Sequence, residues 1–430
     1  EAVAAGEITE AEIDRSVRRL LEARFEVGDF DYESVVPYKN IPMSIVNRKE
    51  HRELALQMAR ESIVLLQNKK SILPLSPDLN VAVMGPNAVD SMMLWGNYYG
   101  RPFHTVTVLD GIRRFAPSAR YIPGCTFTDQ AVGQQTGVPY DGTQPKEVKT
   151  AESGRTTGAS IVGQASDADV VIFVGGISSK LEGEEMKVKL PGFRGGDRTD
   201  IELPEAQRRV IAALHEAGKK VVFVNCSGSA MAMVPETEHA DAIVQAWYAG
   251  EQGGLAIAET LFGSNNPSGK LPLTFYKNLS QLPDYEDYNM NNRTYRYFRG
   301  EPLYPFGYGL SYTTFQYKKG KAGLQKDGSV RLSFQLKNTG KRAGTEIAQV
   351  YIRCTEDVNG PIKTLRDFRR ITLQPGETQT VSFVLQPVQF DTFDESTHTM
   401  RVMPGEYEIM YGGSSAGHSL KKINIKLLEN

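Results

Sequence analysis

VVIFVGG, residues Val170–Gly176, is a continuous apolar run that ends in two glycines. A run without polar alternation is expected for a strand that is covered on both faces of its sheet. Similar runs occur at Val81–Met84, 221–224 and 242–246. Helical patterns separate them, as at 204–216, where a proline occupies the first turn. This alternation predicts an α/β sandwich with a mostly parallel sheet, which we assign to residues 37–280.

The apolar period changes to two in the last part of the chain. Residues 330–336 and 347–352 alternate between apolar and polar side chains, and turn signals such as Gln374-Pro375-Gly376 separate the runs. Short strands with regular spacing predict a β-sandwich of the fibronectin type III kind over residues 312–430. Residues 281–311 are rich in tyrosine, asparagine, proline and glycine, and we expect an ordered connector that packs against a neighbouring domain.

The first element is predicted to be a helix. Thr9 and Glu12 have the spacing of a capping box, and Ile13, Val17 and Leu20 follow at helical spacing. No element precedes this helix that could bury its apolar stripe. The partner of this stripe is therefore missing from the chain or lies in a distant part of it. We expect residues 1–36 to hold the last helix of a missing domain and a linker.

Composition excludes several classes of function. The net charge of −2 gives no reason to expect a nucleic acid or an anionic membrane as a partner. No apolar run reaches the roughly 20 residues that cross a bilayer. The three cysteines and six histidines are scattered, so neither a metal site nor a cofactor is expected. The chain starts at Glu1 with no visible export signal.

An unusually long loop follows the strand at Val170–Gly176. About 27 residues (177–203) separate it from the next helix, whereas such loops usually need about 2–6. Long loops at the carboxyl ends of parallel strands are common ligand sites. Glu182, Glu184 and Glu185 crowd into this loop, and neighbouring carboxyl groups suit general acid catalysis. A charged loop is also typical of a plain solvated surface.

The loop and several other segments together resemble glycoside hydrolase family 3, over nearly the whole chain and in the right order. The matching segments are Leu181-Glu182-Gly183-Glu184-Glu185-Met186, Gly192-Phe193-Arg194-Gly195-Gly196-Asp197-Arg198, Ala246-Trp247-Tyr248-Ala249-Gly250-Glu251-Gln252-Gly253-Gly254, Asn266-Pro267-Ser268-Gly269-Lys270-Leu271-Pro272 and Pro305-Phe306-Gly307-Tyr308-Gly309-Leu310-Ser311-Tyr312. Met84-Gly85-Pro86-Asn87-Ala88 and Gly96-Asn97-Tyr98-Tyr99-Gly100 fit as well.

The resemblance implies a fold and an activity. Members of this family join a (β/α)8-like barrel, an α/β sandwich and a fibronectin-like domain. They hydrolyse glycosides with retention, using an aspartate nucleophile on the barrel and a glutamate acid/base on the sandwich. The implied substrates are oligosaccharides with terminal β-glucosyl or β-xylosyl residues, attacked by an exo-acting enzyme. The family also suggests a periplasmic or secreted location and leaves a homo-oligomer open.

The resemblance also assigns roles within the acidic loop. The family pattern places the acid/base on Glu184, although Glu185 stands where glycine is common. Glu182 and Glu185 therefore remain alternatives. Asp197 and Arg198 are expected to form an ion pair that anchors the loop.

A second segment is implied to touch the sugar. Trp95, Asn97, Tyr98 and Tyr99 match residues near the mouth of the family's pocket, where aromatic faces suit sugar C–H surfaces. They are candidate contacts to the leaving-group sugar, and packing beneath the loop is the alternative.

The chain resembles only the C-terminal portion of the family. In the family, the nucleophile lies in a Ser-Asp-Trp motif. The two tryptophans of this sequence, Trp95 and Trp247, are preceded by Leu94 and Ala246 instead of aspartate, so the motif is absent from it. We therefore expect this chain to act with a barrel domain that it lacks. Two alternatives stay open. One is a non-catalytic sugar-contacting or structural fragment. The other is a nucleotide-binding α/β protein, which the absence of a G-x-G-x-x-G pattern and the lost donor at Pro86 disfavour.

Overall fold

The computed structural model describes residues 1–129 and 158–428. Residues 130–157, which we assigned to the α/β sandwich, and the last two of the assigned β-sandwich lie outside the described ranges. The chain divides into two compact units, Glu1–Glu53 and Leu54–Asn430. Each unit is described by itself.

The first unit is built around helix α1 (Glu10–Glu26), followed by the short 3-10 helices η1 (Glu33–Val35), η2 (Pro37–Asn40) and η3 (Met43–Ile45). The predicted capping box is confirmed, because the Thr9 hydroxyl accepts from the Glu12 amide and the Glu12 carboxylate accepts from the Thr9 amide. None of the α1 residues is buried. Its apolar stripe therefore has no cover within this unit.

The second unit contains a six-stranded sheet of order β1-β9-β8-β4-β2-β3. All neighbouring strands are parallel except β1, which pairs antiparallel with β9. The mostly parallel sheet predicted from the apolar runs is confirmed, since those runs form four of its strands. The strands are β1 (Val64–Asn68), β2 (Val81–Met84), β3 (Arg120–Ile122), β4 (Val170–Gly176), β8 (Val221–Cys226) and β9 (Ala242–Gln245).

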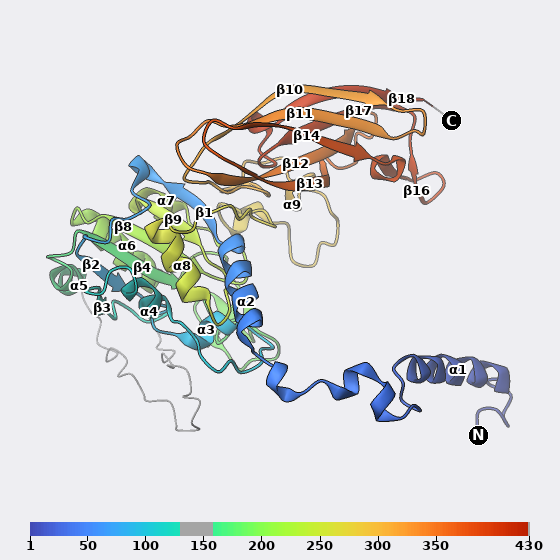
Figure 1. The fold of residues 1–430 in the computed structure, drawn as a ribbon, viewed down its shortest axis with the longest axis horizontal. Coiled ribbons are helices and arrows are strands. Elements are labelled where there is room, and N and C mark those ends of the chain that lie inside the picture. The colour runs from blue at the N-terminus through green and yellow to red at the C-terminus, as the bar shows by residue number, and fades with distance from the viewer. Residues whose placement is uncertain (130–157, 429–430) are drawn as a thin grey trace. The chain divides into compact units, whose positions relative to one another are not determined.

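Helices cover both faces of this sheet (Figure 1). One apolar core joins the sheet to α2 (Lys49–Ser62), α3 (Ser91–Trp95), α4 (Val108–Arg113) and α8 (Gly253–Phe262). A second core lies on the other face with α5 (Gly158–Gln164), α6 (Glu205–Glu216) and the segment around α7 (Val234–His239). Strands β2, β4, β8 and β9 are buried along their whole length, as their lack of polar alternation requires.

The connector is ordered: η5 (Leu279–Gln281) ends at its first residue, and α9 (Thr294–Tyr297) lies within it. The Tyr295 ring stacks on Phe306 at a centroid distance of 4.1 Å, and both contact Tyr351 of the following domain. The expected packing against a neighbour is therefore present for these rings. Tyr285 and Tyr288 are instead almost fully exposed.

The C-terminal domain is a β-sandwich, as the two-residue period predicted. Its two main sheets have the orders β10-β11-β14 and β13-β12-β17-β18 and enclose one apolar core. The strands are β10 (Phe315–Leu324), β11 (Val330–Asn338), β12 (Gly344–Cys354), β13 (Thr364–Leu373), β14 (Thr378–Leu385), β17 (Gly405–Gly412) and β18 (Lys421–Leu427), with a small hairpin of β15 (Asp391–Asp394) and β16 (Thr399–Val402). An ion pair between Lys270 and Glu346, at 3.3 Å, links this domain to the α/β sandwich.

Candidate active site

The acidic loop after β4 folds back on itself. Its own small sheet consists of β5 (Lys189–Leu190), β6 (Phe193–Arg194) and β7 (Asp197–Arg198). The Gly183 amide donates to the Gly196 carbonyl at 3.0 Å, and the Met186 amide donates to Gly195 at 3.1 Å. The apolar side chains of Leu181 and Phe193 are buried in the core of the α/β sandwich. The loop is therefore an ordered platform rather than a solvated strand connection.

Buried amides fix the point where the loop leaves the sheet. The Gln207 side chain on α6 accepts from the Gly176 amide and donates to the Gly176 carbonyl, both at 2.7 Å. The side-chain amide of Asn87 donates to the backbone carbonyls of Gly175 and Ile177. These contacts satisfy backbone groups that the end of β4 would otherwise bury unpaired.

An ion pair ties the next part of the loop to a helix. Lys180 lies 3.0 Å from the Asp90 carboxylate, which is fully buried. Asp90 also caps α3 by accepting from the amides of Met92 and Met93. One carboxylate therefore holds both the loop and helix α3, which ends at Trp95, the first residue of the Trp95–Tyr99 segment.

Glu182 is held on both of its carboxylate oxygens. The Tyr248 hydroxyl donates to Oε1 at 3.1 Å, and the Ser229 hydroxyl donates to Oε2 at 3.0 Å. Its backbone carbonyl accepts from the Asn97 side chain at 3.3 Å. Burial raises the pKa of Tyr248 above its ordinary value, and the charge of Glu182 adds to this shift. Tyr248 therefore stays a neutral hydroxyl donor to this carboxylate.

The expected ion pair between Asp197 and Arg198 is not formed. The Arg198 guanidinium turns inward and donates to the carbonyls of Asp200, Ala230 and Glu202 and to the Ser229 hydroxyl. Burial lowers the pKa of Arg198, and the nearby Glu182 opposes that effect. The Asp197 carboxylate is exposed. Adjacent residues of a strand point to opposite faces, which separates these two side chains.

Glu184 and Glu185 are exposed at the tip of the loop. The Glu184 carboxylate lies beside the Tyr98 hydroxyl, and this contact is the main cause of the raised pKa of Tyr98. Glu185 has a positive φ of 49°, so the backbone turns sharply after Glu184. The structure thus brings Glu184, but not Glu182, to an accessible position beside Tyr98.

The second predicted segment lies against the loop. Asn97 contacts the backbone of Glu182, and Tyr98 contacts the side chain of Glu184. Trp95 is partly buried, donates to the Thr105 hydroxyl at 2.9 Å, and lies 5.0 Å from Tyr99 between ring centroids. Tyr98 is 84% exposed. Trp95 therefore packs beneath the surface, whereas Tyr98 is free to meet a ligand.

Two residues of this site carried no assigned role in the sequence. Tyr248 stands in one of the segments that resemble the family, but nothing in that segment indicates a contact with Glu182. Ser229 stands in none of them. In residues 1–129 and 158–428, no group of three or more acidic, histidine or cysteine side chains is arranged to hold a metal ion. Within the same ranges, no helix is both long and apolar enough to cross a bilayer.

Fold and site together define an α/β sandwich followed by a β-sandwich, with a carboxylate-bearing platform at the carboxyl end of the interior strand β4. Residues 63–312 match the family model for the glycosyl hydrolase family 3 C-terminal domain, and residues 346–415 match the model for a fibronectin type III-like domain. The chain therefore belongs to glycoside hydrolase family 3. This confirms the resemblance drawn from the sequence motifs.

Relatives extend this match over the whole chain. A xylan 1,4-β-xylosidase of Xylanibacter ruminicola is 40% identical over 99% of this chain and 64% of its own length. A periplasmic β-glucosidase of Salmonella typhimurium is 35% identical over 96% of this chain and 55% of its own length. The solved structure of a β-glucosidase from Erythrobacter marinus has a TM-score of 0.82, with 35% identity over 99% of this chain and 57% of that one. The chain thus spans between half and two thirds of the length of these relatives.

Proposed function

We propose that this chain is part of a retaining, exo-acting β-glycosidase that removes terminal β-glucosyl or β-xylosyl residues from oligosaccharides. In this proposal the chain supplies the general acid/base, Glu184, and a barrel domain supplies the aspartate nucleophile. The names of the relatives, a xylosidase and two glucosidases, support the substrate class.

One observation carries the choice of Glu184, namely the different surroundings of the loop glutamates. Both oxygens of Glu182 already accept hydrogen bonds from protein hydroxyls. Glu184 is exposed and lies beside Tyr98, a candidate sugar contact. A general acid must come within hydrogen-bond distance of the glycosidic oxygen, so its carboxyl group has to be accessible. Glu182 suits the role of a loop support.

In the proposed reaction, Glu184 protonates the departing glycosidic oxygen while the nucleophile attacks the anomeric carbon. Glu184 then removes a proton from the water that releases the sugar. Retention requires the two carboxyl groups to stand about 5–5.5 Å apart. The length of the loop and its internal hairpin give Glu184 the reach and the fixed geometry that this distance demands. Tyr98 would hold the Glu184 carboxylate in place between the two steps.

The test is Glu184→Gln in a protein that includes the barrel domain. General acid catalysis contributes about 10²–10⁴ in rate, so glycosides with poor leaving groups should lose that factor, whereas activated nitrophenyl glycosides lose far less. Azide should restore turnover of the activated substrates, because it attacks the glycosyl-enzyme without a general base. Glu185→Gln is the matched exposed control and should keep its activity on both substrate types.

Three results would contradict the proposal. If Glu182→Gln gives the azide-rescued pattern and Glu184→Gln does not, the acid/base is Glu182. If the 430-residue chain alone hydrolyses a nitrophenyl glycoside at a substantial rate, the nucleophile does not come from another domain. Complete inactivity of the barrel-containing protein on all β-glycosides would favour the non-catalytic, sugar-contacting alternative.

A further inference from the structure

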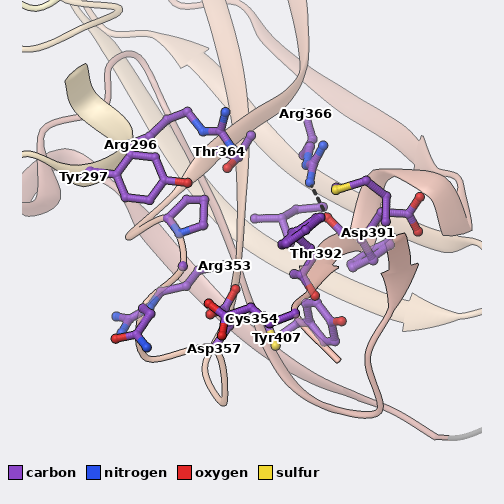
Figure 2. Close-up of a pocket in the computed structure, with 18 residues that line it drawn as sticks. Arg296, Tyr297, Arg353, Cys354, Asp357, Thr364, Arg366, Asp391, Thr392 and Tyr407 are labelled. Carbon is purple, nitrogen blue, oxygen red and sulfur yellow. Dashed lines mark hydrogen bonds between the residues drawn. The ribbon is translucent and has the colours of Figure 1, made fainter. Parts of the chain in front are cut away.

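Charged side chains are distributed unevenly over the β-sandwich. Three arginines and three carboxylates line a cavity between the connector and the sandwich, namely Arg296, Arg353, Arg366, Asp357, Asp391 and Glu395 (Figure 2). Opposite charges are matched there, so charge does not select a ligand for that cavity. The three-stranded sheet β10-β11-β14 differs, because none of its strands contains an aspartate or a glutamate.

Burial and pairing register show which side chains of this sheet face solvent. The three strands lie side by side, with β11 in the middle (Figure 1). On β11 the even-numbered positions 330–336 are buried in the sandwich core, so Arg331, Lys337 and the odd-numbered positions between them face outward. Lys318 and Lys321 of β10 pair with two of these outward positions, 335 and 333. All four cations therefore lie on one face, which we call the outer face.

A β-bulge gives the two β10 lysines the same direction. From Lys318 to Lys321, three steps along β10 correspond to two steps along β11. Strand side chains alternate between faces, so Lys321 would point into the core without the extra residue. Lys319 lies within the bulge and has a positive φ of 53°, which is unfavourable for a residue with a side chain. The strand thus contains a strained residue at the point that turns Lys321 outward.

The cations of the outer face form a line along the strands. They occupy four successive rows of paired residues, in the order Lys337, Lys318, Lys321 and Arg331. Rows that face the same side are about 6.8 Å apart, so the line extends over about 20 Å. Neighbouring cations are therefore within about one Debye length of each other at physiological salt, and their fields add. A line of this length matches an extended polyanion better than a single small anion.

Carboxylates do not compensate this line. Among residues 1–129 and 158–428, none of its four cations, nor the exposed Lys319, makes an ion pair. The two carboxylates that flank these strands in sequence bind their own turns, since Asp327 accepts from the Ser329 amide and Glu377 accepts from the Gln374 amide. On the other sheet, by contrast, a lysine of β18 forms an ion pair with a glutamate of β17 at 3.0 Å. The outer face therefore offers positive charge to a partner.

The other side chains of the outer face indicate the chemistry of that partner. In the two central rows, Gln335 pairs with Thr380 and Ser333 pairs with Ser382, so amide and hydroxyl groups stand beside the lysines. No outward position of the three strands holds an aromatic ring, on which the bases of a single-stranded nucleic acid would stack. Apolar groups for insertion into a lipid surface are equally scarce in the central rows. Sugar hydroxyl groups, by contrast, can exchange hydrogen bonds with all four polar side chains.

We propose that the outer face of the β10-β11-β14 sheet binds an acidic polysaccharide, a chain of sugar residues that carry carboxylates. The carboxylates meet the line of lysine and arginine side chains, and the sugar hydroxyl groups meet the serine, threonine and glutamine side chains. Such binding keeps the protein on a polymer while the proposed catalytic loop acts on chain ends, and this benefit rests on the proposed function. Binding itself needs neither Glu184 nor a barrel domain, so its failure would leave the proposed hydrolysis untouched.

Titration calorimetry on the 430-residue chain, at about 0.1 M salt, tests the proposal with polygalacturonate and with its methyl ester. The two polymers share one sugar chain, but the ester has lost the negative charges. We expect polygalacturonate to bind at least about tenfold more tightly than the ester, because only it can form charge-assisted hydrogen bonds with the cations. A DNA duplex and vesicles of phosphatidylserine and phosphatidylcholine represent the other polyanions, and both should also bind at least about tenfold more weakly than polygalacturonate.

A double variant locates the binding surface. Lys318→Gln combined with Lys321→Gln removes the two central cations and should weaken polygalacturonate binding about tenfold or more. Lys70→Gln combined with Lys220→Gln is the matched control, because it removes the same charge from exposed positions of the α/β sandwich and should leave the affinity unchanged. Circular dichroism verifies that both variants are folded.

Four results would each overturn the proposal. They are no binding of polygalacturonate, equal binding of its methyl ester, equal or tighter binding of the DNA duplex or the vesicles, and an equal loss of affinity in the control variant. The third result would assign the outer face to a nucleic acid or a membrane, and the fourth would show that net charge rather than this surface is responsible.

Discussion

Replacing Tyr248 by phenylalanine isolates the contact that holds the acidic loop. The substitution removes one hydroxyl and keeps the ring, which packs against the core of the α/β sandwich. That hydroxyl donates to Glu182 Oε1 at 3.1 Å and joins residues 66 positions apart in the chain. Without it, Glu182 keeps only the hydrogen bond from Ser229 to its side chain.

The expected loss of stability follows from the charge of the acceptor. A hydrogen bond to an ionised group contributes about 1.5–3 kcal/mol to stability. Because Tyr248 and Glu182 are both partly shielded from water, we expect Tyr248→Phe to lower the free energy of unfolding by about 2 kcal/mol. Tyr285→Phe is the matched control, because Tyr285 is 93% exposed and its change should stay within about 0.5 kcal/mol of zero.

Urea unfolding followed by tryptophan fluorescence measures this loss. Trp95 and Trp247 are the two tryptophans of the chain, and both pack against the cores of the α/β sandwich, so the signal reports on that domain. The midpoint should fall while the slope against urea stays unchanged.

A double-mutant cycle decides whether Glu182 is the source of the effect. In a Glu182→Ala background, Tyr248→Phe should cost far less than it does alone. An equal cost in both backgrounds would refute the reasoning, because the hydroxyl would then stabilise the domain through some other contact.

Two further predictions concern the loop hairpin and a buried carboxyl group. A Cβ on Gly196 would lie 1.9 Å from the Gly183 carbonyl oxygen, and Gly196 has a φ of 96°, so Gly196→Ala should open the hairpin and speed proteolysis of the loop. Gly195 has free space around it, so the control Gly195→Ala should lower the free energy of unfolding by only about 1 kcal/mol. Equal protease sensitivity of the two variants would contradict this prediction. Burial raises the pKa of Glu236 to about 7, against the opposing effect of Arg208. The folded state therefore binds more protons than the unfolded chain, so stability is fully present below about pH 4.5 and up to about 3 kcal/mol is lost as the pH rises through 7. Glu236→Gln should flatten this dependence in urea unfolding at several pH values, and an unchanged pH profile would show that another group is responsible.

Local patterns in the sequence predicted much of the fold. The run Val170–Gly176 becomes a fully buried strand because a segment without polar alternation has no face to offer to water. The capping box of Thr9 and Glu12 forms because both partners lie within one helical turn. The long acidic loop was visible as an excess of residues between strand and helix. Strands β1 and β3 escaped prediction: β3 has only three residues, and β1 ends in polar residues and takes its place by antiparallel pairing with the distant strand β9.

The sequence by itself therefore determined the four buried central strands and their alternation with helices, the change to a β-sandwich and the presence of an acidic loop, because these depend on periodicity and on neighbours in the chain. Only the tertiary structure separated Glu182 from Glu184, since the hydroxyl groups that bind Glu182 come from residues 47 and 66 positions further along. It also directed Arg198 away from Asp197 and gathered Arg296, Arg353 and Arg366 around one cavity. Such groupings arise from the packing of distant segments, and no local pattern of residues encodes them.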